Sequence, residues 1–137
     1  MFFKREKLGN KNEDLIKVAA LLIHAAKIDE NYSDKEEQLV RKTLIEIGAD
    51  KANIEKLLID AKKAEANSVQ ILDFTKEVKN MKDTNKIKIV ETLWRIIYSN
   101  NDADIYETNL MRRLEGLLYI DSNIMGAIKD KIKKENK

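Results

Sequence analysis

The chain has 137 residues, of which 43% are apolar and 36% charged, with four glycines and neither proline nor cysteine. This length fits one domain with a buried core, and the scarcity of helix-breaking residues predicts a helical protein. The absence of cysteine excludes disulfides, thiolate metal sites and a cysteine nucleophile. A net charge of +2 and basic stretches without interleaved aromatic residues disfavour a nucleic-acid-binding surface.

The first predicted helix runs from an N-cap at Asn12 to about Ile28 and is apolar on nearly every side. Such a helix has to be covered all round, so we expect it at the centre of the fold. After a polar loop, Ser33 and Glu36 form the S-x-x-E capping box of a second helix, which Gly48 ends as a left-handed C-cap.

The other five predicted helices each begin at a residue that can cap a helix N-terminus: Asp50, Ser68, Asp83, Asp104, and Asp121 or Ser122. The helix that begins at Asp83 is the second nearly all-apolar one, and we expect it to share the centre with the first. The prediction is an all-α, compact bundle of about seven helices, with a segment 1–9 before a single domain 10–137.

A sequence repeat relates the two halves of this domain. Residues 15–50 align without a gap to residues 86–121, so that Ile16 falls on Ile87 and Asp50 on Asp121. Each copy reads as an apolar helix, a polar loop and an amphipathic helix. The sequence therefore predicts an internal pseudo-two-fold duplication that places two acidic loops in equivalent positions.

The two loops carry oxygen side chains at matching positions, which can converge on a hard cation. These candidate metal ligands are Asp29, Asn31 and Glu36 in the first loop and Asn100, Asp102, Asp104 and Glu107 in the second. We expect weak binding of calcium or magnesium, stronger at the first loop, which has more carboxylates. The alternative is that the residues serve only as helix caps and turns, because Ser33–Glu36 and Asp104–Glu107 are complete capping boxes. The loops are not EF-hands, because they lack the glycine at position 6 and the glutamate at position 12 that an EF-hand requires.

No catalytic constellation or phosphate-binding glycine loop is present, so we expect a non-enzymatic interaction or sensing module. The alternative from another class is a small hydrolase that uses His24 with Glu91 or Asp29 as acid–base partners. The ordinary interpretation is that His24 lies at the boundary of the core with one hydrogen bond, and that Glu91 pairs with Arg95 within one helix. A third reading is a protein–protein adaptor that binds no metal.

The N-terminal segment begins with Phe2 and Phe3 beside two basic residues. These phenylalanines either cap the core or contact a partner protein or a membrane surface. No apolar run approaches the roughly 18–20 residues of a membrane span, and no secretory signal is expected. We therefore expect a cytoplasmic, membrane-proximal protein whose partner is another protein.

Over roughly residues 10–135 the chain resembles the TerB-like family of bacterial tellurite-resistance and stress-associated proteins. The resemblance rests on LLIHAAKIDENYSDKEEQLV, ETLWRIIYSNNDADIYETNLMRRL and the DFTKEV segment between them. Asp29, Glu36 and Glu107 match the family pattern, whereas Glu30, Asn100 and Asn101 depart from it. The resemblance implies a duplicated all-α fold and a stress protein whose acidic residues are associated with metal. The loss of a carboxylate at Asn100 weakens that expectation for the second loop.

Overall fold

The computed structural model describes residues 2–28, 33–68, 70–99 and 105–135, with the side chains of residues 2–12 and 105–107 left undescribed. The described residues form seven α-helices and one 3₁₀ turn and contain no strand. They are α1 (Phe2–Lys27), α2 (Asp34–Glu46), η1 (Lys51–Asn53), α3 (Ile54–Asn67), α4 (Leu72–Lys79), α5 (Asp83–Tyr98), α6 (Ile105–Leu117) and α7 (Ser122–Glu135). The predicted all-α class is confirmed. No helix in these ranges is long and apolar enough to cross a membrane.

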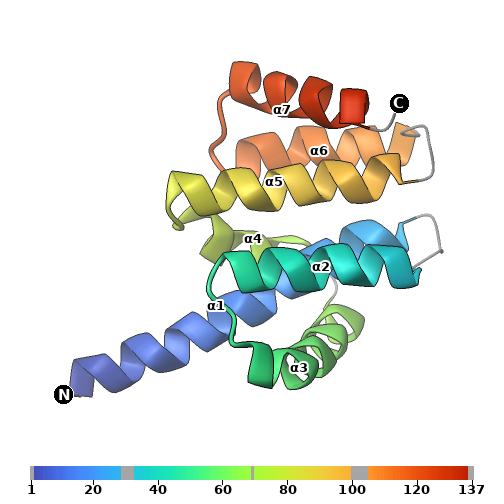
Figure 1. The fold of residues 1–137 in the computed structure, drawn as a ribbon. Helices are drawn as coiled ribbons and strands as arrows, with labels where there is room; N and C mark the ends of the chain where they lie inside the picture. The colour runs from blue at the N-terminus through green and yellow to red at the C-terminus, as the bar shows by residue number, and fades with distance from the viewer. Residues whose placement is uncertain (1, 29–32, 69, 100–104, 136–137) are drawn as a thin grey trace.

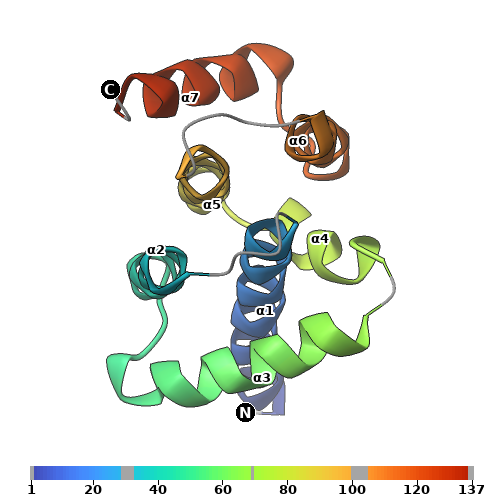
Figure 2. The same cartoon turned by 90° about the vertical axis from the view of Figure 1, so that its right-hand side faces the viewer.

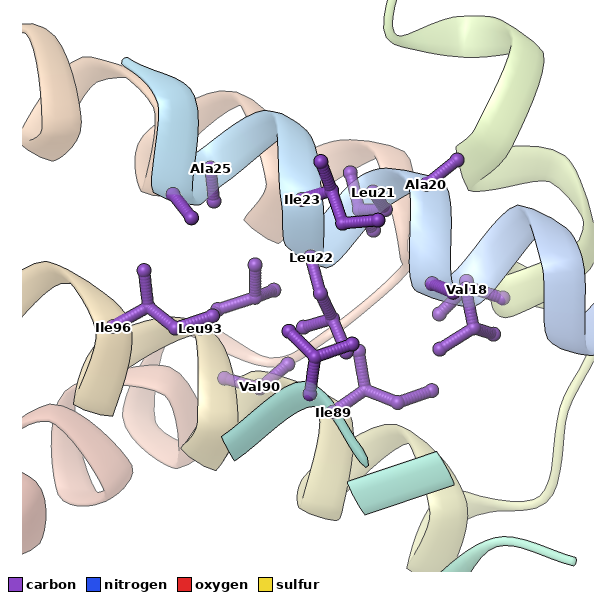
Figure 3. Close-up of a cluster of buried hydrophobic side chains, with 14 of the residues drawn as sticks. Val18, Ala20, Leu21, Leu22, Ile23, Ala25, Ile89, Val90, Leu93 and Ile96 are labelled. Carbon is purple, nitrogen blue, oxygen red and sulfur yellow. The ribbon is translucent and has the colours of Figure 1, made fainter. Parts of the chain in front are cut away.

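The two apolar helices, α1 and α5, lie at the centre of the bundle. Helix α1 packs against α2, α3, α4 and α5, and α5 also packs against α2 and α7 (Figure 2). Side chains of Leu22 on α1 and of Val90 and Leu93 on α5 meet where the two helices face each other (Figure 3), and all three are fully buried. The sequence correctly predicted this centre, because a helix without a polar face cannot border water.

Helices α1 and α4 begin elsewhere than predicted. Helix α1 starts at Phe2, ten residues before the expected cap at Asn12, and its first turns extend past the other helices (Figure 1). Residues 2–11 contain Gly9 but no proline, so nothing in them obliges the helix to stop. Helix α4 starts at Leu72 rather than at Ser68, because the Ser68 hydroxyl stabilises a turn by accepting a hydrogen bond from the amide of Gln70.

Helices α2 and α6 end in the same way, at positions related by the offset of the sequence repeat. Gly48 and Tyr119 both have positive φ, 119° and 56°. The amide after each donates to a carbonyl five residues earlier, from Ala49 to Leu44 at 2.8 Å and from Ile120 to Glu115 at 3.0 Å. This is the hydrogen bond of a Schellman C-cap. Gly48 acts as predicted. The internal duplication itself stays a prediction.

The helices that follow these caps also begin alike. The Asp50 carboxylate accepts a hydrogen bond from the amide of Ala52 at 3.0 Å, and Asp121 accepts one from the amide of Asn123 at 2.7 Å. Asp50 thereby starts η1, which leads into α3, and Asp121 starts α7. The predicted cap at Asp121 is confirmed, whereas Asp50 caps η1 and the N-cap of α3 is Asn53. At Asp50 and at Asp121 a short acceptor side chain satisfies an amide that has no partner within the helix.

Candidate functional site

Of the seven predicted metal ligands, the structure describes only the side chain of Glu36. This residue is 2% exposed, and its Oε1 accepts hydrogen bonds from the amide of Ser33 at 2.8 Å and from the Ser33 hydroxyl at 3.0 Å. The Ser33 hydroxyl in turn accepts from the amide of Glu36 at 3.2 Å. The capping box is therefore complete, and the Oε1 atom of Glu36 is already engaged at the start of α2.

The other six candidates lie outside the described side chains: Asp29, Asn31, Asn100, Asp102, Asp104 and Glu107. The backbone of Glu107 is part of α6. The helix ends that border the two loops lie at the same end of the bundle, with α1 and α2 beside one loop and α5 and α6 beside the other (Figure 1). Within the described residues, no three His, Asp or Glu side chains are grouped so that they could hold a metal ion.

His24 is partly exposed at this end of the bundle, where its side chain has 38% of its surface accessible. Its Nδ1 lies 3.2 Å from Oε2 of Glu65 on α3, and Lys27 Nζ donates to Oε1 of the same carboxylate at 2.8 Å. Because an ionised carboxylate only accepts hydrogen bonds, this contact assigns the proton to Nδ1. In the neutral ring, Nε2 then keeps its lone pair.

The Glu65 carboxylate holds this cluster together. Burial by itself raises the pKa of Glu65, but the hydrogen bonds from Lys27 and His24 outweigh that effect and leave the pKa below its ordinary value. Glu65 is therefore ionised at neutral pH and provides the negative charge between two basic side chains on α1. The three residues tie the end of α1 to the end of α3.

Two hollows meet at His24 and Arg113. One, of about 260 Å³, includes Glu65, Ser68 and Phe74 in its lining, and the other, of about 420 Å³, includes Ile28 and Leu110. Helices α1, α3, α4 and α6 and the connection before α4 contribute to them. The second hollow lies between the last turn of α1 and the first half of α6, the two helices that adjoin the acidic loops. This His24–Arg113 junction is the candidate site.

The hydrolase alternative required His24 to work with Glu91 or Asp29. The carboxylate that bonds His24 is Glu65, and Asp29 lies outside the described residues. Ser68 lines a hollow with both His24 and Glu65, but its hydroxyl lies 2.5 Å from the Asp73 carboxylate. That contact directs the hydroxyl proton away from the imidazole, so the arrangement lacks the nucleophile–base hydrogen bond of a serine hydrolase.

Glu91 and Arg95 on α5 were predicted to pair with each other, but both form their hydrogen bonds with α7, and only a Coulombic attraction between the two remains. Glu91 accepts a hydrogen bond from Lys131 at 2.7 Å, and Arg95 donates to Glu135 at 3.1 Å. Both partners lie on α7, which packs beside α5 and offers each residue an opposite charge across the helix interface. Glu91 therefore helps to fix the contact between α5 and α7. His24 contacts α3 and is not paired with Glu91.

Sequence reasoning missed Glu65 and Arg113. Each stands among ordinary charged positions of an amphipathic helix, and neither belongs to a motif. Glu65 is 41 residues from His24 along the chain. Contacts at such separations follow from how helices pack, which single-sequence periodicity does not encode.

The fold and site together define a small helical bundle with a histidine–carboxylate cluster at the end where α1 and α5 end and α2 and α6 begin. The sequence model of the family described as tellurite resistance protein TerB matches residues 15–130. The chain therefore belongs to the TerB family, which is associated with tellurite resistance. No curated protein and no solved structure matches the chain.

Proposed function

We propose that the protein is a non-enzymatic interaction or sensing module of a bacterial tellurite-resistance-like stress response. The observation that carries this proposal is the His24–Arg113 junction, where four helices meet around two hollows. Among the described residues, the Glu65 carboxylate on α3 pairs with His24 and Lys27 on α1, and the Ser68 hydroxyl is hydrogen-bonded to Asp73. Such an arrangement suits recognition by a rigid surface better than proton transfer to a substrate.

Survival of bacteria on tellurite tests this proposal. Cells that lack the gene should regain resistance when they express the wild type, and lose most of it when Arg113→Ala is expressed instead. Lys63→Ala is a suitable control because Lys63 is an exposed residue of α3 that does not line the junction. If Arg113→Ala and the wild type gave equal resistance at equal protein levels, the junction would play no part in tellurite resistance.

The hydrolase alternative is tested separately with a broad panel of ester and phosphate substrates. Our proposal expects no turnover above that of His24→Ala. Turnover that disappears in His24→Ala would show that the protein is an enzyme and would contradict the proposal.

We further propose that the first acidic loop binds a divalent cation weakly, and more strongly than the second. The support is the higher number of carboxylates around Asp29 and the loss of one at Asn100. Calcium and magnesium prefer charged oxygen ligands, and without an EF-hand cage we expect dissociation constants no tighter than about 10⁻⁴ M. Because Glu36 also caps α2, Asp29→Asn is the cleaner variant for calorimetric titration. If the wild-type protein shows neither a heat of binding nor a shift in melting temperature with millimolar metal, the loop residues serve only as helix caps and turns.

Partner contact through Phe2 and Phe3 is part of the same proposal. The first turns of α1 extend past the bundle, where another protein or a membrane surface can reach them (Figure 1). Deletion of residues 1–9 should abolish co-purification of the partner with little change in melting temperature. A large loss of stability would show that these residues belong to the core.

A further inference from the structure

A separate hollow of about 330 Å³ lies between α5, α6 and α7. Trp94, Met111 and Met125 are the large apolar residues of its lining, and each is at most 5% exposed. The Trp94 indole N–H points to the sulfur of Met125 at 3.4 Å, so its donor is engaged within the floor. The volume is at the lower end for sites that bind small molecules. Methionine side chains are flexible, so this floor can adapt to an apolar group placed on it.

The rim of this hollow carries more positive than negative charge. Arg112 on α6 and Lys129 on α7 line it together with one acid, Glu115. The Glu115 carboxylate accepts a hydrogen bond from the Ser122 hydroxyl at 2.7 Å, whereas neither Arg112 nor Lys129 has an ion pair in the part of the chain that the structure describes. Lys129 Nζ lies 5.5 Å from the centre of the Trp94 ring. An ammonium group therefore stands directly above the apolar floor.

We propose that this hollow binds a small amphipathic anion, a short acyl or aryl carboxylate. The apolar part of the ligand rests on Trp94, Met111 and Met125, and its carboxylate pairs with Lys129 and Arg112. The charge combination selects the anion, because an apolar cation of the same length meets two like charges at the rim. This site is independent of the His24–Arg113 junction and of the acidic loops.

Trp94 is the only tryptophan of the chain and lines the hollow, so its fluorescence reports occupancy directly. Octanoate titrated into the protein should change the Trp94 emission saturably. Octylamine, with the same chain length and the opposite charge, should bind at least about tenfold more weakly. Replacement of both cations, Arg112→Met with Lys129→Met, should weaken octanoate binding by about tenfold or more and remove the preference for the anion.

A pair of glycine variants distinguishes this hollow from other apolar surfaces. Gly126 lines the hollow and Gly116 does not, and a Cβ atom at either position meets nothing within 4 Å. Gly126→Leu should fill the edge of the hollow and abolish octanoate binding, while Gly116→Leu should bind as the wild type does. Thermal melts of both variants should show cooperative unfolding, because leucine favours a helix more than glycine does.

Three results would overturn the proposal. The first is the absence of any saturable change in Trp94 emission with octanoate below its aggregation range. The second is equal binding of octanoate and octylamine, which would mean that the rim charges play no part. The third is wild-type affinity in a folded Gly126→Leu variant, which would place the ligand elsewhere on the protein.

Discussion

The effect of exchanging glycine and alanine should change sign between the helix caps and the helix interiors of this protein. Gly48 and Tyr119 follow α2 and α6 with positive φ, of 119° and 56°. Gly116 and Gly126 lie inside α6 and α7. A side chain's Cβ crowds the following carbonyl when φ is positive, whereas in a helix interior it restricts the unfolded chain and favours the helix.

The size of the stability difference between glycine and alanine at each cap follows from the positive φ. At residue 48, alanine should be less stable than glycine by about 1 kcal/mol. At residue 119 the informative comparison is Tyr119→Gly with Tyr119→Ala, because both variants lose the ring that lies 4.9 Å from Lys79 Nζ. Glycine should again be favoured, by about 1 kcal/mol.

The two interior glycines provide the matched control. A Cβ atom at residue 116 or residue 126 meets no neighbour within 4 Å, so alanine enters without a clash. Gly116→Ala and Gly126→Ala should therefore each stabilise the protein by about 0.5–1 kcal/mol, through helix propensity alone.

Urea unfolding followed by far-ultraviolet circular dichroism measures these differences. For a chain of this length, 1 kcal/mol corresponds to a melting shift of about 3–5 °C, which thermal scans resolve. Equal stability of Tyr119→Gly and Tyr119→Ala would refute the left-handed cap at the end of α6. A loss of stability in Gly126→Ala would refute the open space beside α7.

Two further predictions concern the core and the response to acid. Leu22→Ala should lower the free energy of unfolding by about 2–5 kcal/mol, because Leu22 is fully buried between the two central helices; a loss below about 1 kcal/mol in urea unfolding would contradict that placement. Glu65 has a folded pKa below its ordinary value, despite burial, because Lys27 and His24 bond it. Its stabilising contribution is therefore present above the unfolded pKa and is lost as the pH falls through the folded pKa. Glu65→Gln should show a smaller fall in melting temperature from about pH 6 to about pH 3 than the wild type, and an unchanged acid profile would exclude the ion pairs as its cause.

The amino-acid sequence by itself determined those features that depend on neighbours within one or two helical turns. Ser33 and Glu36 are three residues apart, so their reciprocal hydrogen bonds require only that a helix begins there. Gly48 ends α2 because it adopts a positive φ without steric cost. The central position of α1 and α5 was also predictable, since helices without a polar face have to be surrounded by other helices.

Only the tertiary structure decided which charged residues meet. Arg95 was a suitable partner for Glu91 within α5, but α7 brought Lys131 and Glu135 alongside, and a contact across the helix interface formed instead. His24 met Glu65 in the same way, through the packing of α1 on α3. Charged residues on amphipathic helices have many admissible partners of opposite sign, so the sequence leaves their pairing open.

The tertiary structure also decided the cap at Tyr119 and the hollow above Trp94. Tyrosine gives no sequence signal for positive φ, and the turn is held by the hydrogen bond from the amide of Ile120 to the carbonyl of Glu115. Trp94, Met111 and Met125 are buried residues of the core. The hollow beside them exists because α5, α6 and α7 meet there without filling the space, and the gap between packed helices depends on their relative placement in three dimensions.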